Sequence, residues 1–315
     1  MGKQKEISEL SFIICSIVRD AENGLRHNIP VIEEFCKIAK SYQVIVFEND
    51  SKDGTKKLLR KWAANDSNVH VFCEDNGKFS GSYASESNSK NVNPFYSRRR
   101  IGKMVELRNQ YMDYIWQHNL SADYLMVVDL DVDRINLSGI VSCFQHDAYW
   151  DAVTSFGYSF GPKLRTRYHD TFALEEYGKM DVPRTEKNIY ELQDKYRNPK
   201  VNDWVRVDSA FGGLAIYRFE AIRGLRYKLI DNADDRIACR CEHTSLAMQM
   251  KDRGYGRIFI NPQMRIHYQR LTLKIIWNSL FRKLDSTYRK TKRILFVMHL
   301  PPPSSRSGND GQIHS

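Results

Sequence analysis

The sequence predicts an α/β fold in which helices flank a mostly parallel central sheet. Short β-branched and apolar runs alternate with helix-length amphipathic segments from residue 11 onward, as in doubly wound sheets. Residues 124–128 are a mostly apolar run that suits a strand buried on both faces. Asp129, Asp131 and Asp133 follow it directly. Ligands of open α/β sheets bind just outside the carboxyl ends of strands, so we expect a site there.

The first half of the chain carries most of the alternation. Asn28-Ile-Pro30 is expected to open one helix and Thr55 to cap another. Residues 76–97 are rich in Asn, Ser and Gly and predict a long mobile loop. The expected strands are 11–18, 43–47, 69–73 and 124–128, and the expected helices are 28–40, 56–64 and 101–118.

The second half predicts further strands around an irregular segment. Residues 160–206 are charged, aromatic and without clear periodicity, which suits a wall for an acceptor. Pro262 is expected to stop the last strand, and Gly254 to close the helix before it. The expected strands here are 152–157, 211–217 and 255–261, the expected helix is 244–253, a basic amphipathic helical extension is expected over 269–300, and 301–315 should be disordered.

Composition narrows the class of protein. An apolar content of 42% with 12% aromatic residues marks a globular chain, and its six scattered cysteines favour reduced thiols over a disulfide framework. The net charge of +10 implies an anionic partner, such as nucleic acid, an acidic membrane or a nucleotide diphosphate. The sequence has neither an apolar run of eighteen residues nor a signal-peptide pattern. We therefore expect a cytoplasmic protein, either free or peripheral at a membrane.

The three carboxylates after residue 128 predict a metal site. Crowded at a strand end they would repel one another, and a hard divalent cation would relieve that repulsion while also holding a phosphate-bearing substrate. A calcium loop is excluded because Arg134 and Ile140 occupy the places that need Gly and Glu. An Asp133–Arg134 surface pair or plain solvation of a strand end explains one Asp better than three.

Four motifs, in order, resemble the nucleotide-sugar glycosyltransferases with the GT-A fold, of the family 2 type. The resemblance spans roughly residues 11–268. It implies a GT-A domain over 1–268, with a nucleotide-binding half at 1–135 and an acceptor half at 136–268. The motifs are Glu48-Asn-Asp50-Ser-Lys-Asp53-Gly-Thr55, Arg108-Asn109, Asp129-Leu-Asp131, and the run from Cys241 to Tyr255 with Asn261-Pro262 and His267.

The resemblance assigns roles to individual residues. Glu48 and Asp50 would contact the nucleotide, whereas Asp53 is expected to be mainly structural in its turn. Arg108 would pair with a phosphate or with a carboxylate of the site. Asp129 would bond the ribose or a metal-bound water, and Asp131 would ligate Mn²⁺ or Mg²⁺. Asp133 is either a further ligand or solvent-facing, and His267 would ligate the same cation.

The general base is left open by the sequence. Glycosyl transfer with inversion needs a group that removes a proton from the acceptor hydroxyl. The family has a Glu-Asp pair at this point, and this chain has Glu242-His243 instead. Matching by position favours His243, and the usual carboxylate base favours Glu242.

The expected function is metal-dependent transfer of a sugar from a UDP- or GDP-sugar to a hydroxyl of a glycan, polysaccharide or lipid-linked acceptor. A haloacid-dehalogenase-type phosphatase is disfavoured because its Asp motif follows the first strand. A basic nucleic-acid-binding protein is disfavoured because clustered carboxylates repel phosphate without a metal, so no nucleic acid is expected. Residues 271–298 would lie on an anionic membrane or pack on the domain with a solvated basic face.

Overall fold

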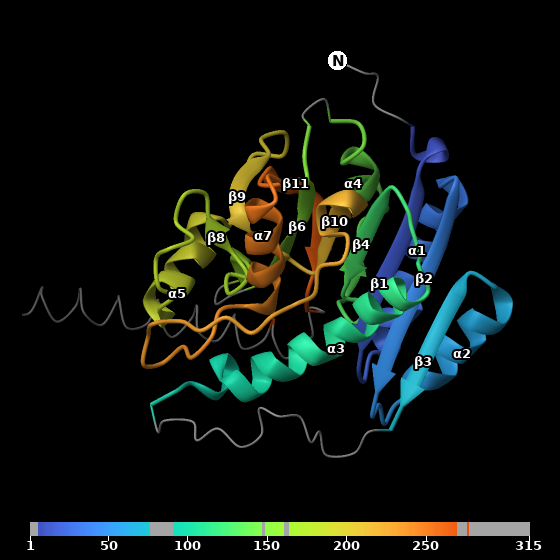
Figure 1. Cartoon of the computed structure of the whole chain (residues 1–315), viewed down its shortest axis with the longest axis horizontal. Helices are drawn as coiled ribbons and strands as arrows, with labels where there is room; N and C mark the ends of the chain where they lie inside the picture. The colour runs from blue at the N-terminus through green and yellow to red at the C-terminus, as the bar shows by residue number, and fades with distance from the viewer. Residues whose placement is uncertain (1–5, 76–90, 147–148, 161–163, 270–275, 277–315) are drawn as a thin grey trace, which may run out of the picture. The chain divides into compact units, whose positions relative to one another are not determined.

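A computed structural model describes residues 6–75, 91–146, 149–160, 164–269 and 276. The chain divides into one unit of Met1–Phe160 and Thr166–Arg270 and another of Gly161–Arg165 and Leu271–Ser315. Nearly all described residues belong to the first unit (Figure 1). Most of the expected loop at 76–97, nearly all of the expected extension at 269–300 and the tail at 301–315 lie outside the described residues. Within the described part, none of the helices combines the length and apolarity that a membrane span requires.

The described residues form a mixed eleven-stranded sheet in the order β3-β2-β1-β4-β10-β6-β11-β9-β8, with β5 on β11 and β7 on β6. The predicted parallel pairing holds from β3 to β4, and again between β6 and β11, whereas β10 runs antiparallel to both β4 and β6. The strands are β1 (Ser11–Val18), β2 (Ser41–Asn49), β3 (Val69–Glu74), β4 (Tyr124–Val128), β5 (Arg134–Ile135), β6 (Ala152–Phe160), β7 (Thr166–Tyr168), β8 (Glu175–Glu176), β9 (Val205–Ser209), β10 (Leu214–Arg218) and β11 (Ile258–His267).

Helices cover both faces of the sheet, which confirms the predicted α/β class. Alternate residues of β1 enter two separate cores: Phe12 and Ile14 pack with α1, α2 and α4, and Ile13 and Cys15 pack with α3, α5 and α7. Figure 1 shows α3 and α7 in front of the sheet. The helical segments are η1 (Ile7–Glu9), α1 (Glu22–Ile38), α2 (Thr55–Asn65), η3 (Pro94–Tyr96), α3 (Arg98–Gln117), α4 (Leu137–Ser142), α5 (Glu186–Lys195), α6 (Phe219–Ile222) and α7 (Glu242–Asp252).

The two boundaries that had been predicted from prolines were wrong. Helix α1 begins at Glu22, not at Asn28, and Pro30 lies inside it. The early start is possible because the β2–α2 turn bonds the first amides of α1: Glu22 N–H donates to Asp53 at 3.0 Å. Strand β11 runs through Pro262 to His267 with a register shift between Asn261 and Arg265. A bulge of this kind is where a sheet tolerates proline.

Candidate functional site

The turn after β4 carries Asp129, Asp131 and Asp133, and α1 fixes its backbone. The buried Asn28 amide donates to the carbonyls of Leu130 (3.2 Å) and Val132 (2.7 Å) and accepts from Ile135 N–H (3.1 Å). A Cβ at Gly24 would lie 2.5 Å from the Leu130 carbonyl oxygen, so α1 is in close contact with this turn. Asn28 therefore acts as a clamp on the carboxylate turn.

Arg108 links the end of β4 to the start of α7. Its side chain comes from α3, and the residue is 3% exposed. Nε donates to Glu242 Oε1 at 3.0 Å, and Nη2 donates to Asp129 Oδ1 at 3.3 Å. The guanidinium also lies 4.9 Å from the ring centroid of Phe211. One buried cation thus holds two carboxylates that are 113 positions apart in the sequence (242 minus 129). Arg108 was predicted to pair with a phosphate or with a carboxylate, and in this structure its partners are carboxylates.

Burial and crowding disfavour the charged forms of Asp129 and Asp131. Burial raises the pKa of Asp129, Arg108 opposes that rise, and Asp131 and Asp170 add to it. Burial also raises the pKa of Asp131. The largest cause of both shifts is desolvation, whereas repulsion between carboxylates, which the sequence pattern implied, adds to the shift at Asp129; a cation placed here would stabilise both charged forms.

Asp133 and His267 form a pair that joins the carboxylate turn to the end of β11. His267 Nδ1 lies 2.8 Å from Asp133 Oδ2, and both side chains are largely buried. Because a carboxylate accepts, Nδ1 carries the proton, and the lone pair of a neutral ring lies on Nε2. That Nε2 atom is buried and has no hydrogen-bond partner among the described residues. Asp133 is therefore not solvent-facing, and its neighbour has a nitrogen free for a ligand.

Glu242 and His243 open α7, and their surroundings differ. Glu242 is bonded to Arg108 and accepts from the Cys241 thiol at 3.4 Å. His243 stacks on Phe211 with centroids 3.8 Å apart, and neither ring nitrogen has a hydrogen-bond partner within the described part of the chain. Burial and the nearby Arg108 hold the pKa of His243 well below its usual range. A proton on His243 is therefore unfavourable, and Glu242 is the better-placed acceptor of one.

Glu48 and Asp50 lie at the carboxyl end of β2, two strands from β4. Glu48 is buried: Oε1 accepts from Ser51 N–H at 2.7 Å, and Oε2 makes no hydrogen bond to any described residue. Asp50 has a left-handed φ of 56° and accepts from the Asn49 amide at 3.3 Å. Asp53 accepts from the backbone of Thr55 and Glu22, and so ties two helix starts together.

Two further residues near this centre had escaped the sequence patterns. Asp170 accepts from Gly212 N–H at 3.1 Å, and burial raises its pKa to about 6, with Glu242 adding to the rise. Tyr268, next to His267, stacks on His169 with centroids 4.0 Å apart. Asp170 lies in a segment without periodicity, so the sequence gave no signal for it. For Asn28 the sequence did contain a signal, because this polar residue shares the apolar face of α1 with Leu25 and Ile32.

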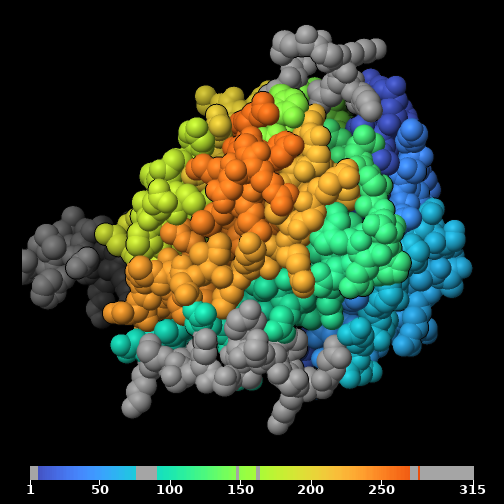
Figure 2. Space-filling view, viewed as in Figure 1, coloured from blue at the N-terminus to red at the C-terminus, as the bar shows by residue number. Residues whose placement is uncertain are grey.

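The donor set for a metal is incomplete if only protein atoms are counted. Within the described residues no three His, Cys, Asp or Glu side chains are gathered closely enough to hold an ion. Mg²⁺, however, is usually held by one or two carboxylates together with substrate phosphates. The unpartnered Nε2 of His267 and the crowded carboxylates fit such a shared site. In Figure 2 the residues around α7 cover the middle of the face seen in Figure 1.

Comparison with known proteins places the chain in a family. Residues 11–249 match the family model described as Cryptococcal mannosyltransferase 1. This match spans well over half of the chain, and the protein therefore belongs to the Cryptococcal mannosyltransferase 1 family. The family is one of glycosyltransferases, which confirms the class that the four motifs indicated. No curated protein matches the chain.

Solved structures resemble the chain at low identity. Mannosyltransferase PcManGT from Pyrobaculum calidifontis, in complex with GDP-Man and Mn²⁺, is 12% identical with a TM-score of 0.44. S. aureus TarS 1-349 is 14% identical with a TM-score of 0.44, and GalNAc-T7 with UDP, GalNAc and Mn²⁺ is 13% identical with a TM-score of 0.45. The alignments cover 82%, 81% and 86% of this chain but only 56%, 59% and 47% of those chains.

Proposed function

We propose that the protein transfers a hexose, mannose in the first instance, from a GDP- or UDP-sugar to a hydroxyl of a glycan, polysaccharide or lipid-linked acceptor. The sugar is chosen from the family to which the chain belongs. The observation that carries the proposal is the buried chain Asp129–Arg108–Glu242. It joins the carboxylates at the mouth of β4 to a carboxylate at the start of α7, so that donor-binding and proton-accepting groups meet at one centre.

A divalent cation, Mn²⁺ or Mg²⁺, is part of this proposal. Asp131 and Nε2 of His267 would hold it, and Asp133 would orient the imidazole through Nδ1, as carboxylates beside metal-bound histidines commonly do. When bound, such a cation offsets negative charge on the departing nucleoside diphosphate. The raised pKa values of Asp129 and Asp131 and the unpartnered Nε2 support the assignment.

The remaining residues bind and orient the reactants. Asp129 would bond the donor ribose or a metal-bound water, and the β2 turn with Glu48 and Asp50 would contact the base and ribose. Glu242 would take the proton from the acceptor hydroxyl, because its carboxylate is held at the centre whereas His243 is buried between rings. His243 then serves to pack the start of α7 against Phe211.

A single assay tests the function. The protein is incubated with Mn²⁺ and a panel of GDP- and UDP-sugars, and both thermal unfolding and release of nucleoside diphosphate are followed. We expect a metal-dependent rise in melting temperature with one nucleotide and slow diphosphate release that an acceptor accelerates. Release of inorganic phosphate from phosphomonoesters would favour a phosphatase instead, and binding of nucleic acid with no nucleotide effect would reject both enzymes.

The cytoplasmic, membrane-peripheral location and the membrane contact of residues 271–298 also belong to this proposal. That segment carries seven basic residues between positions 274 and 293 against Asp285. Flotation with anionic vesicles would compare the full chain with a variant in which Arg289, Lys290 and Lys292 are replaced with Gln. Equal partitioning of the two proteins would count against a membrane-bound acceptor site.

A further inference from the structure

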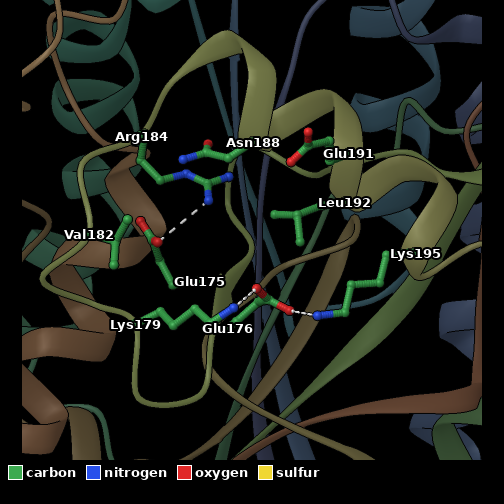
Figure 3. Close-up of a pocket in the computed structure, with 9 residues that line it drawn as sticks. All are labelled: Glu175, Glu176, Lys179, Val182, Arg184, Asn188, Glu191, Leu192 and Lys195. Atoms are coloured by element: carbon green, nitrogen blue, oxygen red, sulfur yellow. Dashed lines mark hydrogen bonds and ion pairs between the residues drawn. The ribbon is translucent and has the colours of Figure 1, made fainter.

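A pocket lined mostly by charged residues lies between β8 and α5, on the acceptor half of the chain. It is a cavity of about 290 Å³. Figure 3 shows charged side chains pointing toward one another across it. Its lining residues are Glu175, Glu176, Lys179, Val182, Arg184, Asn188, Glu191, Leu192 and Lys195.

On one wall, two guanidinium groups share a single buried carboxylate. Arg240 Nη1 donates to Glu175 Oε1 at 2.7 Å, and Arg184 Nη1 lies 3.7 Å from Glu175 Oε2. Arg184 is only 4% exposed, and its Nη2 donates to the carbonyl of Thr171. Its Nε has no hydrogen-bond partner in the described part of the chain. Two buried cations therefore share one carboxylate, and of the two it is Arg184 that lines the pocket.

A second carboxylate is shared in the same way. Glu176 accepts from Lys179 Nζ at 2.7 Å and from Tyr196 Oη at 3.0 Å, and it also pairs with Lys195. The two lysine side chains remain 56% and 58% exposed, so their other protons are available to a ligand. The third acid, Glu191, is 65% exposed and lies 4.0 Å from Lys187, where water screens it.

The buried arginine is short of counter-charge. Burial lowers the pKa of Arg184, and Arg240 lowers it further, although Glu175 opposes both. A buried charge without full pairing is costly, and an anion bound in the pocket would reduce that cost. The chain connects this wall to the reaction centre, because Arg240 stands two residues before Glu242.

We propose that this pocket binds an anionic group, a carboxylate or a phosphate, carried by the acceptor sugar. Lys179 and Lys195 would bind the anion through their exposed ammonium groups, and the buried guanidinium of Arg184 would add its positive charge from the wall of the pocket. The volume suits about one sugar residue, near the lower end for small-molecule sites. The assignment to the acceptor rests on the proposed function, whereas anion binding by the pocket does not.

Calorimetry on the full chain tests this without donor or metal. The probes are glucuronate, glucose 6-phosphate and neutral glucose. We expect at least one acidic sugar to bind about tenfold or more tightly than glucose, with an affinity that falls as salt is added. Preference for glucuronate identifies a carboxylate ligand, and preference for glucose 6-phosphate identifies a phosphate. Equal binding of all three sugars would overturn the proposal.

Variants locate the binding. Arg184→Lys removes the guanidinium that contacts Glu175 and the Thr171 carbonyl, and Lys195→Gln removes an exposed cation, so each should weaken acidic-sugar binding about tenfold. Lys187→Gln is the matched control, since Lys187 is on the same helix but does not line the pocket, and it should bind as the parent does. If Arg184→Lys fails to fold, Lys195→Gln alone tests the proposal, and an unchanged affinity of that variant for the acidic sugar would contradict it. If acidic sugars bind but no nucleotide does, the anion site stands and its link to an acceptor falls.

Discussion

Nδ1 of His267 lies 2.8 Å from Oδ2 of Asp133, while Nε2 of the same ring has no hydrogen-bond partner among the described residues. The pair couples the last residue of β11 to the turn after β4, and it fixes which ring nitrogen carries the proton. In the proposed metal site, a ring held in this way would bind the cation through Nε2.

His267→Gln should therefore weaken the apparent affinity for Mn²⁺ strongly, and Asp133→Asn should weaken it about 10- to 100-fold by releasing the ring. Mn²⁺ titration in the presence of GDP or UDP, followed by thermal unfolding, measures both. His118→Gln changes an exposed histidine at the end of α3 and is the control. Parent-like Mn²⁺ affinity in the His267 variant would remove this residue from the metal site.

Asp131→Ala should abolish metal-dependent nucleotide binding and leave the fold intact. Desolvation raises the pKa of this carboxyl and so disfavours its charged form without a cation, and its loss should therefore keep or raise the melting temperature of the free protein. Nucleotide titration with and without Mn²⁺ tests binding, and Asp203→Ala, at an exposed position, is the control. Retained metal-dependent binding would show that the turn does not hold the cation through Asp131.

Gly24→Ala should disturb the carboxylate turn from a distance. The new Cβ would come within 2.5 Å of the Leu130 carbonyl oxygen and 2.8 Å of Asp131 Cα, and either α1 or the turn must move. We expect a loss of about 1–3 kcal/mol in unfolding free energy and a weaker Mn²⁺ response. Gly256→Ala is the control, because its nearest contact would be 3.6 Å away. Equal stability of the two variants would mean that the turn after β4 accommodates a Cβ at position 24 without cost.

Glu242→Gln should lower kcat by about 10²- to 10⁴-fold, with a smaller effect on donor affinity, because it removes the proposed proton acceptor. His243→Phe keeps an aromatic ring, one atom larger, against Phe211 and removes two ring nitrogens that have no hydrogen-bond partner among the described residues. It should change kcat less than tenfold. Steady-state kinetics at a fixed acceptor concentration compare the two variants with the parent. A severe loss in the His243 variant, with Glu242→Gln still active, would reverse the assignment.

Asp170→Asn should flatten the pH dependence of stability. The folded pKa of about 6 lies above the ordinary value of 3.8. A raised carboxyl pKa contributes stability that is present below about pH 4 and lost as the pH rises through about 6. The variant should therefore be more stable than the parent at pH 7–8, by about 1–3 kcal/mol. Denaturant unfolding at pH 4, 6 and 8 measures this, and a constant difference across that range would contradict it.

The parallel half of the sheet could be predicted because its signals are local. Strand β4 is a short apolar run that ends in carboxylates, and β1 matches the expected range of residues 11–18. Position along the chain, rather than composition, also placed Arg108 near the carboxylates. Its partners come from β4 and α7, and the ordered motifs put both at the same edge of the sheet.

The errors arose where tertiary contacts outweighed local preference. Pro30 is a poor helix residue, yet α1 extends through it because Thr55 and Asp53 bond the helix start. Pro262 is accommodated by a shift of register in β11. Asp170 reaches the centre through long-range folding of a segment without periodicity, and no pattern in one sequence reports such a contact. The β9–β11 and β10–β4 antiparallel pairings are of the same kind.

A single guanidinium contacts two acids to which the proposed mechanism gives different roles, donor binding for Asp129 and proton transfer for Glu242. Neutralising Asp129, by a proton or a cation, removes a negative charge that opposes the field of Arg108 at Glu242. An empty protein and a loaded one therefore hold Glu242 in different electric fields, without any change of backbone. Binding of the donor with its cation would change the field at Glu242 before the acceptor binds. An ordered sequence of substrate binding would then follow from electrostatics alone.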